Sequence, residues 1–222
     1  MKKLFFASVL VVSGLSYGQR NMDLAQERGA RFGLTAGANR SGVSNAHHPS
    51  GARYGFQGGF LALLPLGKSM QYFIQPEVLY HQAGETGKDK DFKNSSGYDA
   101  LYANNYISVP VYFKMYFSNK ANSFFAMGGP RFNFLMNQKV SDIPSGRPWY
   151  DPDYEGSNGF NGKAAKMNFA IGLGMGYSFD REWEIVIKHD IGLTNTYKGL
   201  MNELSNKKKS EQVISLGVNY IF

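Results

Sequence analysis

The sequence contains no cysteine and relatively few charged residues, and each absence narrows what the chain can be. Without cysteine it has no disulfide framework and no lipoprotein-type signal. Charged residues make up 18% of the chain, below the usual quarter. Aromatic residues reach 15% and glycine 26 residues, a combination that favours strands and turns over helices. A length of 222 residues suits one domain with at most a short appendage.

Long apolar runs and cofactor motifs are also missing. Beyond the first residues, the sequence has no run of 18 apolar residues. A mature chain that crosses a membrane must therefore do so as a closed barrel, because only helices and barrels satisfy their backbone groups in lipid. The sequence has no Gly-rich phosphate loop, zinc pattern or nucleic-acid module. We therefore expect no cofactor, no metal and no catalytic residue.

The first residues have the layout of a secretory signal peptide. Lys2 and Lys3 precede an apolar stretch over residues 4–15, and Ser16-Tyr17-Gly18 places small residues around a cleavage after Gly18. This predicts a signal peptide over 1–18 and a periplasmic N-terminal segment over 19–30; a buried first strand is the alternative. Removing Lys2 and Lys3 leaves 22 basic against 17 acidic residues, a net charge of +5. So mild and dispersed an excess does not indicate nucleic acid as a partner.

Eight segments alternate between apolar and small or polar residues, which is typical of half-exposed strands. In 166–179, for example, Phe169, Leu173 and Met175 share one face, and the opposite face carries only small or polar residues, three of them glycine. Several segments have the length of about 10 residues that a tilted strand needs to cross a bilayer. The predicted strands are 31–39, 54–64, 72–82, 105–117, 123–136, 166–179, 183–195 and 212–222.

Alternation alone is compatible with two kinds of barrel, because a soluble barrel turns its apolar face inward and a membrane barrel turns it outward. The connectors favour the membrane barrel. Short links alternate strictly with long polar ones, as periplasmic turns alternate with extracellular loops. We therefore predict an eight-stranded antiparallel up-and-down transmembrane β-barrel over residues 31–222. The short links are 65–71, 118–122 and 180–182, and the long ones are 40–53, 83–104, 137–165 and 196–211.

The end of the chain and several short motifs carry a family resemblance. The last strand ends in Tyr220-Ile221-Phe222, which looks like the C-terminal insertion signal of outer-membrane barrels, with Tyr220 and Phe222 as its aromatics. Together with the motifs that follow, it resembles the PorT-like outer-membrane β-barrel family of porin-family proteins. The motifs are Phe32-Gly33-Leu34, Gly37-Ala38-Asn39, Gln75-Pro76-Glu77, Leu79-Tyr80, Val109-Pro110, Phe113-Lys114, Gly128-Gly129-Pro130 and Gly192-Leu193-Thr194-Asn195.

The resemblance implies a location in the outer membrane of a Gram-negative cell after removal of the signal peptide. It implies outer-membrane lipid, lipopolysaccharide and the barrel-assembly machinery as partners, and an envelope or secretion-machine protein as a further one. Four residues depart from the expected pattern. Pro76, Pro110 and Pro130 fall inside strands, where proline removes a ladder hydrogen bond. His189 falls on the apolar face of its strand, where a neutral histidine near the interface or a partner contact would fit.

Six charged residues are expected in the lumen because of their position in the alternation. Charges inside a membrane protein are costly and should pair. The simplest interpretation is an ion network that fills a narrow barrel, and the alternative is a proton or ion path. The six predicted lumen residues are Glu77, Lys114, Arg131, Glu184, Lys188 and Asp190.

The long loops hold weaker signals. His47, His48 and Ser50, with Asp151 and Asp153, are the residue types of a hydrolytic site, but no spacing links them. Residues 151–156 resemble the start of a calcium loop, whose twelfth position is Gly162 and not an acid. The run 207–209 consists of three lysines, which suits either a solvated tip or lipopolysaccharide phosphates. The link 137–165 is rich in aromatics, which suits either a partner surface or a self-packed loop: Trp149, Tyr150, Tyr154 and Phe160.

These observations favour a non-enzymatic envelope protein, either structural or presenting its loops to a partner. An accessory role in a type IX-like protein-secretion system is the first alternative, and it rests on the family resemblance. A lipid-modifying barrel enzyme is the second alternative.

Overall fold

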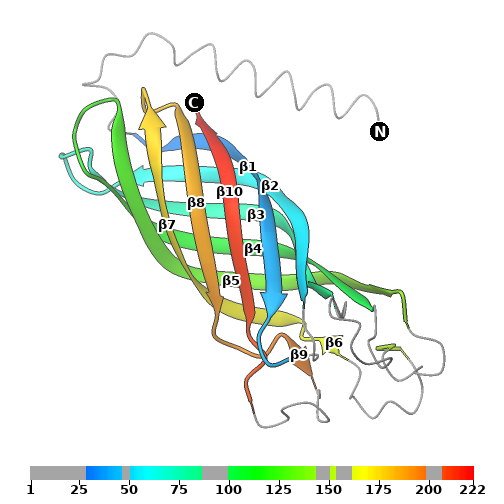
Figure 1. The fold of residues 1–222 in the computed structure, drawn as a ribbon. Coiled ribbons are helices and arrows are strands. Elements are labelled where there is room, and N and C mark those ends of the chain that lie inside the picture. The colour runs from blue at the N-terminus through cyan, green and yellow to red at the C-terminus, as the bar shows by residue number, and fades with distance from the viewer. Residues whose placement is uncertain (1–28, 47–50, 87–99, 144–150, 154–161, 199–206) are drawn as a thin grey trace, which may run out of the picture.

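Eight long antiparallel strands close into a barrel in the computed structural model, which describes residues 29–46, 51–86, 100–143, 151–153, 162–198 and 207–222 (Figure 1). The order around the barrel is β1-β10-β8-β7-β5-β4-β3-β2, so strands that follow one another in the chain are neighbours. The predicted fold class is confirmed. The strands are β1 (Arg31–Val43), β2 (Gly51–Pro65), β3 (Tyr72–Thr86), β4 (Leu101–Tyr116), β5 (Ser123–Ser141), β7 (Met167–Phe179), β8 (Trp183–Gly192) and β10 (Glu211–Ile221).

The alternating residues of each strand face the lumen and the outer surface of the barrel in turn. In β10, Val213, Ser215 and Asn219 are buried in the lumen, whereas Ile214 and Leu216 lie on the outer surface with 45% and 61% of their area exposed. Large exposed apolar side chains cover the outside of the other strands in the same way. The apolar face is therefore the outer one, as in a membrane barrel and unlike a soluble barrel. No helix in the described ranges is long and apolar enough to cross a membrane.

The two ends of the barrel differ. At one end lie the short turns 66–71, 117–122 and 180–182 together with the C-terminus, and we call this the turn side (Figure 1). At the other end, the loop side, β6 (Lys163–Ala164) pairs with β9 (Tyr197–Lys198) in a separate two-stranded sheet. This small sheet was not predicted, because two residues carry no measurable alternation.

Strand lengths on the loop side also differ from the prediction. The strand expected over 105–117 starts at Leu101, and the one expected over 123–136 runs on to Ser141. β3 likewise continues to Thr86. These three strands form a high wall on the loop side, whereas β7, β8 and β10 form a low wall that ends at Met167, Gly192 and Glu211 (Figure 1).

The three in-strand prolines lie in the neighbouring strands β3, β4 and β5. Pro76 lies opposite Val111, and Pro130 opposite Ile171. Pairing between β3 and β4 lapses after Pro76 and resumes at Leu79 in the same register. Pairing between β4 and β5 lapses in the same way after Pro110. The hydrogen-bond ladder is thus interrupted for two residues beside these prolines, and the register is the same on both sides of each gap. The alternation between lumen-facing and outward-facing residues is therefore unchanged.

Candidate functional site: the filled lumen

Three buried ion pairs cross the lumen. The Nζ of Lys114 lies 2.6 Å from the Glu184 carboxylate, and the Nζ of Lys188 lies 2.8 Å from that of Glu77. Arg131 Nη1 lies 2.5 Å from Asp190 Oδ2. All six side chains are nearly or wholly inaccessible to solvent. The structure therefore places each of the six sequence-predicted residues in the lumen and joins them in pairs.

Strand β8 contributes one member of every pair. Glu184, Lys188 and Asp190 occupy inward positions of this strand, and their partners come from β4, β3 and β5. None of those strands is hydrogen-bonded to β8 in the sheet. The pairs therefore act as cross-braces between strands that the backbone ladder does not connect.

Two of the pairs are joined into one network by Gln75. Lys114 Nζ donates to Gln75 Oε1 at 3.0 Å, and Gln75 Nε2 donates to Glu77 Oε1 at 2.7 Å. Glu184 also accepts hydrogen bonds from the Tyr116 hydroxyl at 2.5 Å and from Asn219 Nδ2 at 2.9 Å. Because buried charges need satisfied lone pairs as well as a counter-ion, these donors offset part of the desolvation cost at Glu184.

The third pair has its own polar support. Arg131 Nε donates to Asn133 Oδ1 at 3.0 Å, and its Nη2 donates to the Ser108 hydroxyl at 3.2 Å. Asp190 Oδ1, by contrast, has no hydrogen-bond partner in the described ranges. The Arg131–Asp190 pair is thus less completely satisfied than the Lys114–Glu184 pair.

Glycines on the inner face of β7 make room for this network. A Cβ at Gly172 would lie 2.6 Å from Asp190 Oδ1 and 2.7 Å from the Tyr112 ring. A Cβ at Gly176 would clash with the Ile185 carbonyl and lie 2.6 Å from the Phe125 ring. The small-residue face of this strand therefore follows from the space that the neighbouring strands β5 and β8, and Tyr112 of β4, already occupy.

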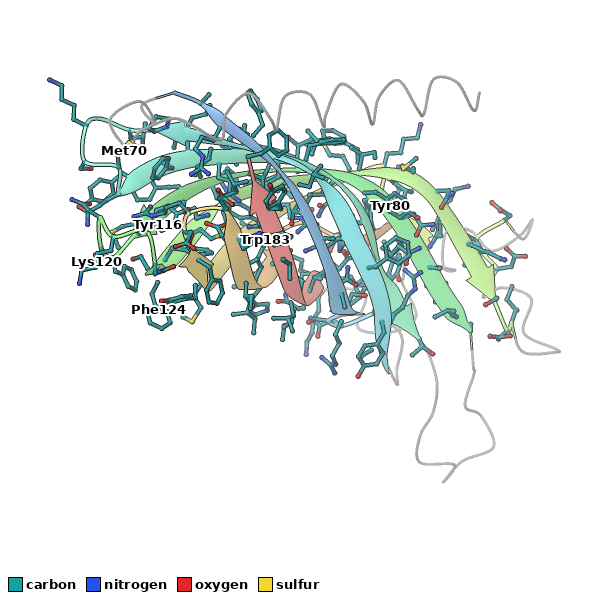
Figure 2. The ribbon with its side chains drawn as sticks, turned by 90° about the horizontal axis from the view of Figure 1, so that it is seen from above. Met70, Tyr80, Tyr116, Lys120, Phe124 and Trp183 are labelled. Atoms are coloured by element: carbon teal, nitrogen blue, oxygen red, sulfur yellow. The ribbon has the colours of Figure 1, made fainter. Side chains whose placement is uncertain are left out.

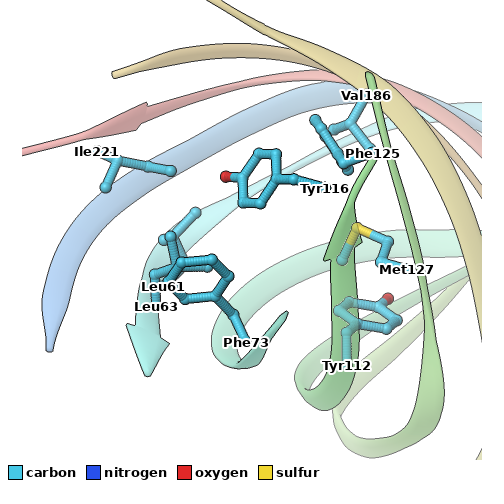
Figure 3. Close-up of a cluster of buried hydrophobic side chains, with 9 residues drawn as sticks. All are labelled: Leu61, Leu63, Phe73, Tyr112, Tyr116, Phe125, Met127, Val186 and Ile221. Carbon is cyan, nitrogen blue, oxygen red and sulfur yellow. The ribbon is translucent and has the colours of Figure 1, made fainter. Parts of the chain in front are cut away.

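An apolar cluster closes the turn side of the lumen (Figure 3). In it, Tyr116 packs edge-on against Phe73 and Phe125, with ring centroids 5.5 Å and 5.6 Å away. The cluster extends from β2 to β10 around the barrel, so side chains from all sides meet there. Its members are Leu61, Leu63, Phe73, Tyr112, Tyr116, Phe125, Met127, Val186 and Ile221.

Arg181, which the sequence did not predict, links the three turns next to this cluster by hydrogen bonds. Its guanidinium lies 3.7 Å from the centre of the Tyr116 ring. It donates to the carbonyls of Ser118, Lys120 and Met70 at 2.7, 3.1 and 3.3 Å. Figure 2 shows Met70, Tyr116 and Lys120 together at this end of the barrel. A single arginine in a turn carries no local signal of such contacts, because its acceptors lie up to 111 residues away in the chain.

The loop side of the lumen is more polar and less complete. His81 stacks on Tyr106, with centroids 6.0 Å apart, and neither of its ring nitrogens has a hydrogen-bond partner in the described ranges. The side chains of Asn39 and Asn104 are also buried without partners there. A small cavity, of about 10 Å³ for the centre of a water molecule, lies beside His81, Arg131, Asp190 and Glu211. It has room for about one water.

A cap covers this polar region. Tyr197 of β9 and Ala164 of β6 pack with Val43, Ala46, Ala100 and Tyr102 in a second apolar cluster. Gln138 holds β6 beside β5, since its Nε2 donates to the Gly162 carbonyl at 2.8 Å and its Oε1 accepts from Ala164 N–H at 2.9 Å. The lumen is thus bounded by side chains at both ends.

Most of the weaker loop signals fall on residues that the structure does not describe. His47, His48 and Ser50 lie outside the described residues, as do Trp149, Tyr150, Tyr154 and Phe160. Asp153 is exposed and lies 3.8 Å from Lys163, which is exposed as well. In the described ranges, no group of three or more acidic or histidine side chains could hold a metal ion. His189 is exposed on the outer face of β8, opposite Leu173 and Ile214.

Comparison with known proteins now identifies the family. The model of the outer membrane protein β-barrel domain matches residues 11–198, which is most of the chain. The chain belongs to this family. The barrel lies in the outer membrane of the Gram-negative envelope, with its exposed apolar face against lipid. No match was found among curated proteins.

Several solved outer-membrane barrels are similar to this protein in fold. Ail, the attachment invasion locus protein of Yersinia pestis, has 10% identity and a TM-score of 0.42 over 87% of this chain and 99% of that one. Neisserial surface protein A has 13% identity and a TM-score of 0.45 over the same shares. A major outer membrane protein of Thermus thermophilus has 16% identity and a TM-score of 0.45, again over 87% and 99%. At these identities the likeness concerns the fold alone.

In an outer-membrane barrel, the aromatic side chains on the outer surface lie against the membrane. On the turn side, Trp183 and Tyr220 lie in contact with ring centroids 4.6 Å apart, and Phe222 follows Tyr220 at 6.3 Å. Phe124 and Tyr177 form a further pair at 4.8 Å. Figure 2 shows Phe124 and Trp183 toward the turn side and Tyr80 toward the other end. Such rings are typical of the interfacial girdle of outer-membrane barrels.

Proposed function

We propose that this protein is a non-enzymatic outer-membrane barrel with a sealed lumen, which anchors its loop-side cap in the envelope and presents it to a partner. The observation that carries the proposal is the set of three buried ion pairs across the lumen. Eight strands enclose a lumen only just wide enough for side chains, and water-filled channels come with about 16 strands or more. A network of paired charges between two apolar clusters leaves little space for solutes to pass.

Conductance tests the sealed lumen directly. Purified protein in planar bilayers should show no stable large conductance. A steady porin-sized conductance from the unmodified protein would overturn the proposal. The same six charged residues would then be better described as a selectivity filter.

Partner capture tests the second half of the proposal and separates it from the alternatives. Crosslinking on intact cells should recover an envelope partner in contact with the loops. Recovery of several subunits of a secretion machine would favour the accessory secretion role that the family resemblance suggests. A lipid-modifying activity would instead alter the lipid profile of a deletion strain, whereas we expect that profile to stay unchanged.

We further propose that Tyr220 and Phe222 form the insertion signal read by the barrel-assembly machinery. Phe222 N–H donates to the Phe32 carbonyl at 2.9 Å, so the last residue closes the junction of the first and last strands. Deletion of Phe222 should lower the amount of assembled barrel without reducing export to the periplasm. Heat-modifiable gel mobility of outer-membrane fractions measures assembly, and periplasmic fractions measure export. Normal assembly of the truncated protein would rule out a role as the signal.

A further inference from the structure

Glu211 is a buried carboxylate that has no cation of its own. It is the first residue of β10, and only 6% of its area is exposed. In the described ranges its side chain has one hydrogen-bond partner, the Tyr106 hydroxyl, which donates to Oε2 at 3.5 Å. No lysine or arginine of those ranges forms an ion pair with it. A buried carboxylate without a counter-ion is costly when charged, and such a group usually becomes neutral instead.

The cations around Glu211 are bonded to other groups. Arg131 pairs with Asp190, and its Nε and Nη2 donate to two neutral side chains. Arg53 of β2 donates to backbone carbonyls of β3 and β4, and Lys209 Nζ donates to a carbonyl in its own segment. None of the three can therefore turn to Glu211 without breaking bonds. The other titratable groups that face this region are His81 and Glu85 of β3, Tyr106 of β4, Asp190 of β8 and Tyr197 of β9.

A proton on Glu211 would also complete the hydrogen bonds of its neighbours. The cavity that has room for about one water is lined by Glu211, Asp190 and Thr196. Asp190 Oδ1 and Thr196 Oγ1 have no hydrogen-bond partner in the part of the chain that the structure describes. The O–H of a protonated Glu211 can donate to a water in this cavity, and that water can donate to Asp190 Oδ1. The proton thus supplies a donor where an acceptor lacks one.

The cavity borders the cap. Thr196, which lines the cavity, is followed in the chain by Tyr197 of the cap cluster. Thr196 N–H donates to the Lys209 carbonyl, and its own carbonyl accepts from Ala165 N–H, both at 2.8 Å. Thr196 therefore joins the segments that lead into β6, β9 and β10. A charge on Glu211 would draw water between these segments, because hydration stabilises a buried ion that has no partner.

We propose that Glu211 is a proton-binding site that controls the cap: the protonated form keeps the cap closed, and loss of the proton loosens it. When the carboxyl O–H bond breaks, the proton leaves to solvent through the loop side, since the apolar cluster closes the turn side. A glutamate in an unfolded chain loses its proton at about pH 4.3. The cap is therefore stable at lower pH and loses stability as the pH rises through the midpoint of proton loss in the folded protein.

This inference rests on the proposed function and deepens it, because it names what regulates the presented cap. Hydrogen exchange of the full protein in nanodiscs from about pH 5 to about pH 9 tests it. Protection factors, which are rates relative to unfolded amides at the same pH, are measured for the N–H groups of Thr196 and Ala165. They should fall by up to about tenfold per pH unit above the midpoint. Those of Tyr116 and Phe117, which bond to carbonyls on the turn side, should stay constant.

Three variants assign the titrating group. Glu211→Gln is neutral at every pH, so its cap protection should stay at the level of the wild type at low pH. The matched control Glu182→Gln makes the same change at an exposed turn-side residue and should keep the pH dependence of the wild type. His81→Phe removes the imidazole that also lines the cavity and should keep it as well. Heat-modifiable gel mobility verifies that the variants are folded.

Several outcomes would overturn the proton-binding role of Glu211. They are cap protection in the wild type that does not change with pH, a pH dependence that survives in Glu211→Gln, and one that disappears in His81→Phe. Recovery of protection at high pH when sodium replaces choline at equal ionic strength would overturn it too, because a bound cation would then compensate the carboxylate. Conductance and partner capture measure other properties, so failure of the proposed function is distinguishable from failure of this inference.

Discussion

The two halves of the lumen differ in how completely the protein satisfies its own buried groups. On the turn side, Glu184 has a counter-ion and two neutral donors, and it lies next to an apolar cluster. On the loop side, His81, Asn39 and Asn104 are buried without partners among the described residues. Buried polar groups without partners are costly, and water is the usual remedy. The Glu184 carboxylate is therefore satisfied within the protein, whereas these loop-side groups are not.

The largest expected effect comes from breaking the turn-side pair. Glu184→Ala leaves Lys114 charged in a site with no access to water, so unfolding free energy should fall by about 3–5 kcal/mol. The temperature at which the barrel band is lost on a gel measures this. The double variant Lys114→Met/Glu184→Leu removes both charges and should recover most of the loss. A double variant as unstable as Glu184→Ala would mean that packing, and not the stranded charge, is responsible.

Arg131→Ala should lower the same temperature by less. It strands Asp190, but the cavity beside Asp190 has room for a water that partly replaces the lost donor. We expect a loss of about 2–3 kcal/mol, below the range for a fully buried pair. The comparison with Glu184→Ala under identical conditions is the measurement. A larger loss for Arg131→Ala would contradict the distinction between the two halves.

Arg181→Gln should lower the unfolding free energy less than the two changes above, and it should loosen only the turn side. It removes hydrogen bonds from a charged donor to three turn carbonyls. One hydrogen bond to a charged group contributes about 1.5–3 kcal/mol, and because these bonds are partly exposed we expect a total loss no larger than that of one such bond. Hydrogen exchange should rise at Met70 and Ser118 before it rises in any strand. Exchange that rises first on the loop side would contradict this role of Arg181.

The smallest change in unfolding free energy is expected from replacing His81. His81→Phe keeps a ring stacked on Tyr106 and removes two nitrogens that have no partner in the described ranges. Unfolding free energy should therefore change by less than about 1 kcal/mol. The same gel assay measures it, with Glu184→Ala as the reference for a satisfied group. A loss as large as that of Glu184→Ala would show that water or another group binds the imidazole strongly.

The sequence was enough to predict the eight strands and the inward position of the six charges, because a period of two marks the strands and the connector lengths indicate which face is the inner one. It was not enough to predict which charges pair. Lys114 and Glu184 are brought together by the stagger of the closed barrel, which alternation within one strand does not encode. The loop-side ends of β4 and β5 were missed because polar residues such as Asn104 and Gln138 interrupt the apolar pattern there. Arg181 was missed because its acceptors are distant in the chain.

Strand β8 also fixes its own alignment through its charges. It carries the charges minus, plus, minus at Glu184, Lys188 and Asp190, and the strands made before it carry the complementary set at Lys114, Glu77 and Arg131. A slip of β8 by two residues would keep every side chain on its proper face, so hydrophobicity alone would not oppose it. That slip would move Lys188 into the place of Asp190, next to Arg131. The ion pairs therefore encode the alignment of the late strands, a task in which buried charges are well attested.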